Sequence, residues 1–101
     1  MAKLTHKSPF GTSFHNTTIK TNVETLISIL GEPTYNDNSG EDKTNYEWVC
    51  ENEDGEVFTI YDWKYYRPIS KTEIIEWHIG GENKQITESC LDELNILISG
   101  L

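Results

Sequence analysis

The sequence has few basic residues and no long apolar run, and each shortage excludes a class of protein. Only 8 lysines and arginines stand against 17 acidic residues, so the formal net charge is −9. This balance argues against general nucleic-acid binding, which requires a basic surface. No apolar stretch approaches the about 18 residues of a membrane span, and no signal peptide is recognisable. We therefore expect a cytoplasmic chain without membrane attachment.

Cysteine is also scarce, and its spacing excludes the usual metal motifs. Cys50 and Cys90 are the only two cysteines, and they form no CxxC pair. The simplest interpretation is two reduced, buried thiols in a reducing compartment. A zinc site that combines both cysteines with a histidine would lack the ligand spacing of known sites. We expect no metal and no cofactor.

Aromatic residues are abundant, at 11% of the chain, and offset a hydrophobic content of only 36%. A few buried aromatic side chains can supply the core of a small domain, because each removes a large apolar area from water. At this length we expect one domain over residues 1–101, with residues 1–9 as a loose N-terminal arm that contains a short strand around residues 3–6.

The first part of the domain reads as a strand followed by a helix. Residues 13–20 carry threonines typical of a half-exposed strand. Thr21 and Glu24 have the spacing of a capping box, which predicts a helix start. Gly31 is placed to end that helix, and the nearby Pro33 prevents its continuation.

Three more strands and a second helix follow, predicted at 45–51, 56–64, 72–79 and from 82 or 83 towards 97. Hairpin-type links join the strands, with Asp54-Gly55 as a turn signal. The order predicts an α+β fold, an antiparallel sheet of about four strands with two helices packed on one face. Both faces of the central hairpin carry aromatic residues, which indicates a second subunit or a ligand on the other face.

One basic and aromatic cluster stands out in this acidic chain, in and beside the segment 64–71. Arginine and lysine neutralise phosphates, and aromatic rings stack on bases, so the cluster predicts a nucleotide contact. The alternative is a loop whose basic side chains pair with neighbouring acids. The candidate ligand-binding residues here are Trp63, Lys64, Tyr65, Tyr66 and Arg67.

Gly80 and Gly81 are a second candidate, where the last strand meets the last helix. Glycine permits a sharp turn, and the N–H groups at a helix start favour an anion, so this junction could hold a phosphate. The pair lacks the spacing of a P-loop, and a plain strand-to-helix turn is the alternative. His15 and His78 are predicted as polar ligand contacts, with ordinary surface histidines as the alternative.

No catalytic motif is recognisable, and we therefore expect a protein that is not an enzyme. There is no serine elbow, no HExxH motif and no telling Cys–His spacing. Asp62 and Glu76 lie on neighbouring predicted strands, where they could act as an acid–base pair. Salt bridges from these acids to Lys64 or Arg67 are the alternative.

Five blocks resemble small proteins of tailed phages and prophages, over nearly the whole chain: GTSFH (11–15), LGEP (30–33), YEW (46–48), DGEVFTIYDWK (54–64) and WHIGG (77–81). The resemblance implies a phage product that acts in the cytoplasm of the infected bacterium. It carries no assigned activity, so no functional residues come with it. In size and compactness the chain is similar to phage proteins that sequester nucleotide immune signals.

The leading hypothesis is a phage anti-defence protein that sequesters a small nucleotide signal without cleaving it. The ligand would be of the cyclic ADP-ribose type or a cyclic oligonucleotide, and the protein a homodimer or higher homo-oligomer. The alternative is an acidic inhibitor of a host defence complex, such as an anti-CRISPR or nucleic-acid mimic, that uses Glu51, Glu53 and Asp54. A third hypothesis, an enzyme that cleaves such signals, predicts loss of the ligand over time.

Overall fold

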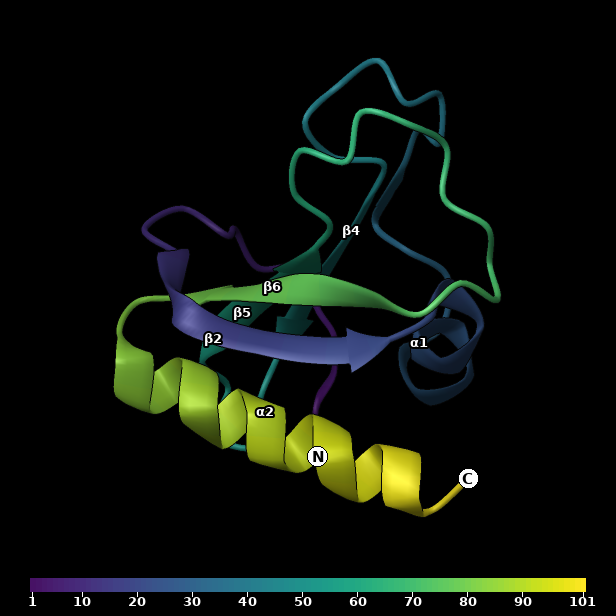
Figure 1. Cartoon of the computed structure of the whole chain (residues 1–101). Helices are drawn as coiled ribbons and strands as arrows, with labels where there is room; N and C mark the ends of the chain where they lie inside the picture. Colours follow the sequence, from purple (N-terminus) through teal and green to yellow (C-terminus); the bar gives the residue numbers. More distant parts are fainter.

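The computed structural model describes residues 1–101 as an antiparallel sheet with two helices. In chain order the elements are β1 (Lys3–Leu4), β2 (Ser13–Thr21), α1 (Val23–Leu30), β3 (Tyr35–Asn36), β4 (Tyr46–Glu51), β5 (Val57–Tyr61), β6 (Ile75–Gly81) and α2 (Lys84–Ser99). The strand order is β1-β4-β5-β6-β2, and β3 also pairs with β4. Figure 1 shows α2 running beneath β2 and β6, with α1 at one end of the sheet. The α+β prediction is confirmed.

The sheet has six strands rather than the predicted four because two of them, β1 and β3, contain only two residues each. Both lie against β4, on the edge that does not pair with β5. Such short strands have no periodicity of their own, so tertiary pairing alone defines them. Neither helix is long and apolar enough to cross a membrane.

The first helix begins one residue later than the capping box predicted. Thr21 is the last residue of β2, and Asn22 is the N-cap, whose side-chain oxygen accepts a 2.8 Å hydrogen bond from the Thr25 N–H. Asparagine is among the best N-cap residues, so it competes successfully with its threonine neighbour. Gly31 ends the helix as predicted, at φ 101°, in the region that favours glycine.

The second helix follows the predicted pattern. Its N-cap is Asn83, which accepts a 2.9 Å hydrogen bond from the Ile86 N–H, and Gly100 ends it. Ile86, Cys90 and Leu94 are buried, as expected from their helical spacing.

The core lies between the sheet and the helices and is built from alternate strand residues. The strands contribute Tyr46, Trp48, Cys50, Phe58, Ile60, Trp77 and Ile79 to it. Trp48 and Trp77 pack edge to face, with ring centroids 5.5 Å apart. Their indole N–H groups donate to the carbonyls of Gly31 and Thr21, each at 2.9 Å. Burial therefore leaves neither ring with an unsatisfied donor.

The N-terminal residues are attached to the sheet, in contrast to the loose arm that the sequence predicted. Ala2 is buried in the core, and β1 pairs with β4. Lys7 adds an ion pair to Glu51 at 3.2 Å and donates to the Gly55 carbonyl at 2.9 Å. These long-range contacts leave no local pattern in the sequence.

Candidate functional site

The sheet face that carries no helix contains a pocket of about 280 Å³, which we call the sheet hollow. Cross-strand register explains its composition, because Glu47, Tyr61 and His78 lie side by side on β4, β5 and β6. Successive strand residues point to opposite faces, so these side chains point away from the core. The residues that line the hollow include Thr12, Ser13, Glu47, Tyr61, Trp63 and Gly80.

Aromatic rings surround one side of the hollow and bring together two predicted site residues, Trp63 and His78. Their ring centroids are 6.3 Å apart, and Tyr61 lies edge-on to both. His78 also stacks on Phe14 at 3.9 Å. Burial lowers the pKa of His78, against the smaller opposing effect of Glu76, and so favours the neutral imidazole. Trp63 is 40% exposed and offers an accessible indole face.

Two lysines flank Trp63, one predicted and one missed by sequence reasoning. The ammonium groups of Lys43 and Lys64 lie 5.8 and 5.6 Å from the indole centroid. The Lys64 N–H donates to the Lys43 carbonyl at 2.8 Å, which joins two segments far apart in the sequence. Neither ammonium forms an ion pair. Lys43 sits in a polar loop without periodicity, so no sequence signal could have placed it here.

Glu47 is a second residue that sequence reasoning did not select. Its side chain is half-buried in the hollow and has no ion-pair partner, and its carboxylate oxygens remain accessible to solvent. Burial raises the pKa of Glu47. Burial raises the pKa of Tyr61 as well, and the neighbouring Glu47 charge adds to this effect. In the sequence, the alternation of residues 45–51 already put Glu47 and Trp48 on opposite faces of the strand. That alternation was the signal available for Glu47.

The glycine pair differs from the exposed turn that the sequence predicted. Gly80 and Gly81 belong to β6, and neither has a positive φ. A Cβ on Gly80 would approach the Thr59 hydroxyl to 2.6 Å, so this glycine keeps the hollow open. A Cβ on Gly81 would approach the Thr87 methyl to 2.8 Å, so this glycine lets α2 pack closely. The Asn83 side chain caps the start of α2 and accepts from one of its N–H groups.

His15 lies beside the hollow but not in its lining. One of its ring nitrogens, Nε2, lies 3.0 Å from the Gly81 carbonyl oxygen and 3.2 Å from the Ser13 hydroxyl. A carbonyl oxygen only accepts hydrogen bonds, so the contact with Gly81 requires a proton on Nε2. This nitrogen therefore serves to hold the strand and is not a free base.

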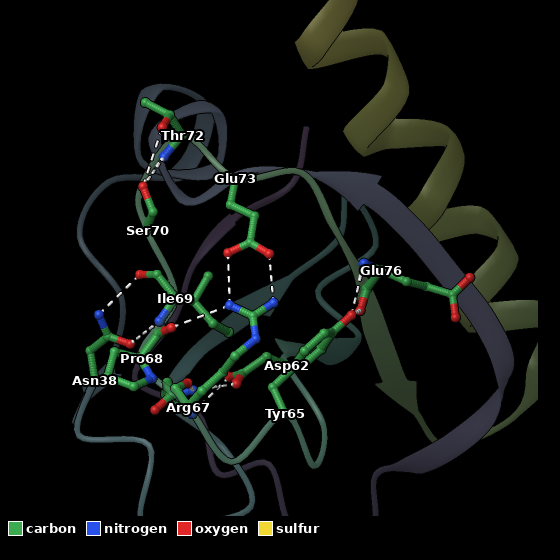
Figure 2. Close-up of polar contacts among 11 residues, drawn as sticks. Asn38, Asp62, Tyr65, Arg67, Pro68, Ile69, Ser70, Thr72, Glu73 and Glu76 are labelled. Carbon is green, nitrogen blue, oxygen red and sulfur yellow. Dashed lines mark hydrogen bonds and ion pairs between the residues drawn. The ribbon is translucent and has the colours of Figure 1, made fainter.

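The segment 64–71 is held by internal contacts, which Figure 2 shows in close-up. The Arg67 guanidinium binds both carboxylate oxygens of Glu73 and lies over the Tyr65 ring, 5.4 Å from its centroid. The Tyr65 hydroxyl accepts from the Glu76 N–H at 3.3 Å. Tyr66 is exposed and lies outside the hollow lining. For Arg67 the structure shows the alternative interpretation, a basic side chain paired with a neighbouring acid.

Asp62 supports this segment through Asn45 and does not pair with Glu76. Its buried carboxylate accepts from the Asn45 N–H at 2.8 Å, the Asn45 amide at 2.9 Å and the Tyr46 N–H at 2.9 Å. The Asn45 amide also donates to the Arg67 carbonyl at 3.0 Å. No lysine or arginine pairs with Asp62. Its role is structural, and no group of metal-ligating side chains gathers elsewhere in the chain.

The sheet hollow therefore combines an accessible indole with an unpaired carboxylate, and two ammonium groups without ion-pair partners lie beside that indole, outside the lining. Comparison of the chain with protein-family models, with curated proteins and with solved structures gave no match in any of the three. What the hollow can bind follows from its own side chains.

Proposed function

We propose that this protein captures a small nucleotide in the sheet hollow without cleaving it, as a phage anti-defence protein that removes an immune signal in the bacterial cytoplasm. One observation carries the proposal. The exposed indole of Trp63 has two ammonium groups close to its ring, those of Lys43 and Lys64, and neither forms an ion pair with an acid of this acidic chain.

This combination suits the two halves of a nucleotide. Stacking of a base on an aromatic side chain contributes about 1–3 kcal/mol in nucleic-acid systems. Lysine ammonium groups are point charges that bind phosphate. All three ion pairs of the chain engage other basic residues, Lys7, Arg67 and Lys84. Five lysines form no ion pair, and two of them, Lys43 and Lys64, lie beside the Trp63 ring.

Capture without cleavage is favoured by the arrangement of possible catalytic groups. Ser13 is the hydroxyl of the hollow that lies near a histidine, but the proton on His15 Nε2 is donated to the Gly81 carbonyl. This nitrogen cannot accept the Ser13 proton at the same time, so the serine lacks a general base. His78 is stacked on Phe14 and makes no hydrogen bond to a nucleophile.

The acidic-inhibitor alternative has less support, because its acidic hairpin is partly neutralised. Among Glu51, Glu53 and Asp54, Glu51 is paired with a basic residue, Lys7. The resemblance of five blocks to phage proteins supports a phage setting under either alternative. A homo-oligomer is part of the proposal, supported by two exposed side chains outside the hollow, Ile74 and Ile96. Light scattering after size-exclusion chromatography measures the number of copies, and a monomer at working concentration contradicts it.

The test incubates the protein with cyclic ADP-ribose isomers and cyclic di- and trinucleotides. The protein is then filtered out and heat-denatured, and the ligand is assayed at both steps. We expect one ligand to disappear on filtration and to return intact on denaturation. Ligand that stays free throughout overturns the proposal, and ligand returned as a new species shows an enzyme.

A matched pair of variants locates the site. Trp63→Ala removes the stacking surface, and we expect it to weaken binding about 5- to 150-fold, the range that corresponds to the energy of base stacking. Tyr66→Ala removes an exposed aromatic ring of the same segment that lies outside the hollow, and we expect no change. Equal binding by Trp63→Ala and the native protein excludes the sheet hollow as the site.

A further inference from the structure

Glu47 is the feature of the hollow that base stacking and phosphate binding leave unexplained. It occupies the β4 position directly opposite Tyr61 and lines the hollow together with Trp63. Although half-buried, it has no partner within the chain. A partly buried carboxylate without a partner costs stability, and functional sites are where such groups accumulate.

We infer that Glu47 recognises the base and that the hollow selects guanine over the other bases, which among the ligands considered favours guanine-containing cyclic nucleotides over cyclic ADP-ribose, an adenine compound. The inference rests on the proposed function, since it requires a base stacked on Trp63. Glu47 would accept hydrogen bonds from the base edge with its two carboxylate oxygens.

The donor pattern of guanine alone matches an ionised carboxylate. A carboxylate accepts hydrogen bonds and cannot donate. Guanine presents two adjacent donors, N1–H and the 2-amino group, on its Watson–Crick edge. Adenine and cytosine place a ring acceptor beside their single amino group, and uracil places a carbonyl on each side of its N3–H. On this edge, each of the three directs at least one acceptor towards Glu47, which is repulsive, and the opposite edge of cytosine offers one donor instead of two.

The lysines argue against the other ligand with paired donors, an arginine side chain. A guanidinium would match Glu47 equally well, and a bidentate bond is its usual geometry. It would also have to lie near the ammonium groups of Lys43 and Lys64, which are 5.8 and 5.6 Å from the centroid of the Trp63 ring. Those charges repel a cation and attract a phosphate, so the hollow as a whole favours a guanine nucleotide.

The test compares GMP, IMP, AMP, CMP and UMP by calorimetry on the native protein and on Glu47→Gln, which preserves side-chain volume. Hydrogen bonds to charged groups are the strong ones, so we expect GMP to bind about 10- to 100-fold more tightly than AMP. IMP lacks the 2-amino group and should fall between them. Glu47→Gln should bring the GMP-to-AMP ratio close to one while AMP binding persists. Glu76→Gln, an exposed acid on the same sheet, should leave the ratio unchanged.

The outcomes separate the inference from the proposed function. Equal binding of GMP and AMP by the native protein, with both weakened in Trp63→Ala, overturns guanine selection and leaves nucleotide capture standing. A preference for N-acetyl-arginine amide over GMP also overturns it. Binding that Trp63→Ala does not weaken removes the proposed function and the inference together. Because IMP is tested on the native protein, the inference stays falsifiable even if Glu47→Gln fails to fold.

Discussion

The sheet hollow and the segment 64–71 contain the same kinds of residue and differ in how those residues are partnered. Each combines aromatic rings with basic and acidic side chains, in it or beside it. Within the segment, Arg67 is bonded to Glu73 and Tyr65 to the Glu76 backbone. Glu47, which lines the hollow, has no ion-pair partner, and neither do Lys43 and Lys64, whose ammonium groups lie beside Trp63.

The contrast teaches that composition locates polar aromatic clusters but does not distinguish a structural cluster from a binding site. A charged group that already has a good partner would have to lose it before it could bind a ligand. An unpaired group on an accessible surface needs no such exchange. We therefore assign stability to the segment and binding to the hollow, and the predictions below test that division.

The largest expected effect is the loss of stability caused by Asp62→Ala, which removes the support of the segment 64–71. This removes a buried carboxylate that accepts three hydrogen bonds from Asn45 and Tyr46. Each buried donor left without a partner costs about 1–3 kcal/mol, so we expect a loss of roughly 3 kcal/mol or more. Urea unfolding followed by tryptophan fluorescence measures it. Glu76→Ala is the control, because that side chain is exposed, and equal losses in the two variants would contradict the anchoring role.

A smaller effect is expected from Arg67→Ala, which tests the segment as a binding site. The guanidinium is exposed, and its pKa is raised by the hydrogen bonds to Glu73. Exposed ion pairs are screened by salt, so we expect a small loss of stability at low salt that disappears at high salt. Nucleotide binding should be unchanged, because Arg67 lies outside the hollow lining. Clear weakening of binding by this variant would return the segment to the site.

The sequence predicts most of the fold because its signals are local. Helical spacing predicts the burial of Cys90 and Leu94, and alternation in β5 puts Phe58 and Ile60 on one strand face. Both faces of the hairpin carry aromatic residues, so alternation alone does not show which face is buried. The strands β1 and β3 cannot be predicted in this way, because a strand of two residues is too short to show a hydrophobic alternation. Only their pairing with β4 makes them strands.

The candidate site is less predictable because it depends on which groups remain unpaired. Sequence reasoning selects Trp63, Lys64 and His78, which the structure gathers around the hollow. It cannot foresee that Glu73 engages Arg67, since many acids are available to pair with it. It also cannot foresee that a hydrogen bond to Lys64 brings the Lys43 segment beside the indole. Partner choice is a tertiary property with no local pattern.

The smallest expected effect concerns two acids on the same strand and the same face, Glu47 and Glu51. Burial raises the pKa of Glu47, so its contribution to stability is present below its ordinary pKa of 4.5 and is lost as the pH rises. Hydrogen bonds from Thr5 and then Lys7 lower the pKa of Glu51, so its contribution is present above 4.5 and is lost as the pH falls. The contributions of Glu47 and Glu51 to stability therefore change in opposite directions with pH.

Substitution by glutamine should reveal these signs at neutral pH. Glu47→Gln removes an ionised group that the folded state disfavours, so its urea midpoint should lie slightly above that of the native protein. Glu51→Gln removes a favoured one, and its midpoint should lie slightly below. The Glu47 difference should vanish below pH 4.5, whereas the Glu51 difference should vanish only at lower pH, because the pKa of Glu51 lies below 4.5. If Glu47→Gln is instead destabilising at neutral pH, Glu47 has a structural partner. The contrast between unpartnered groups in the hollow and partnered groups in the segment 64–71 would then be wrong for Glu47.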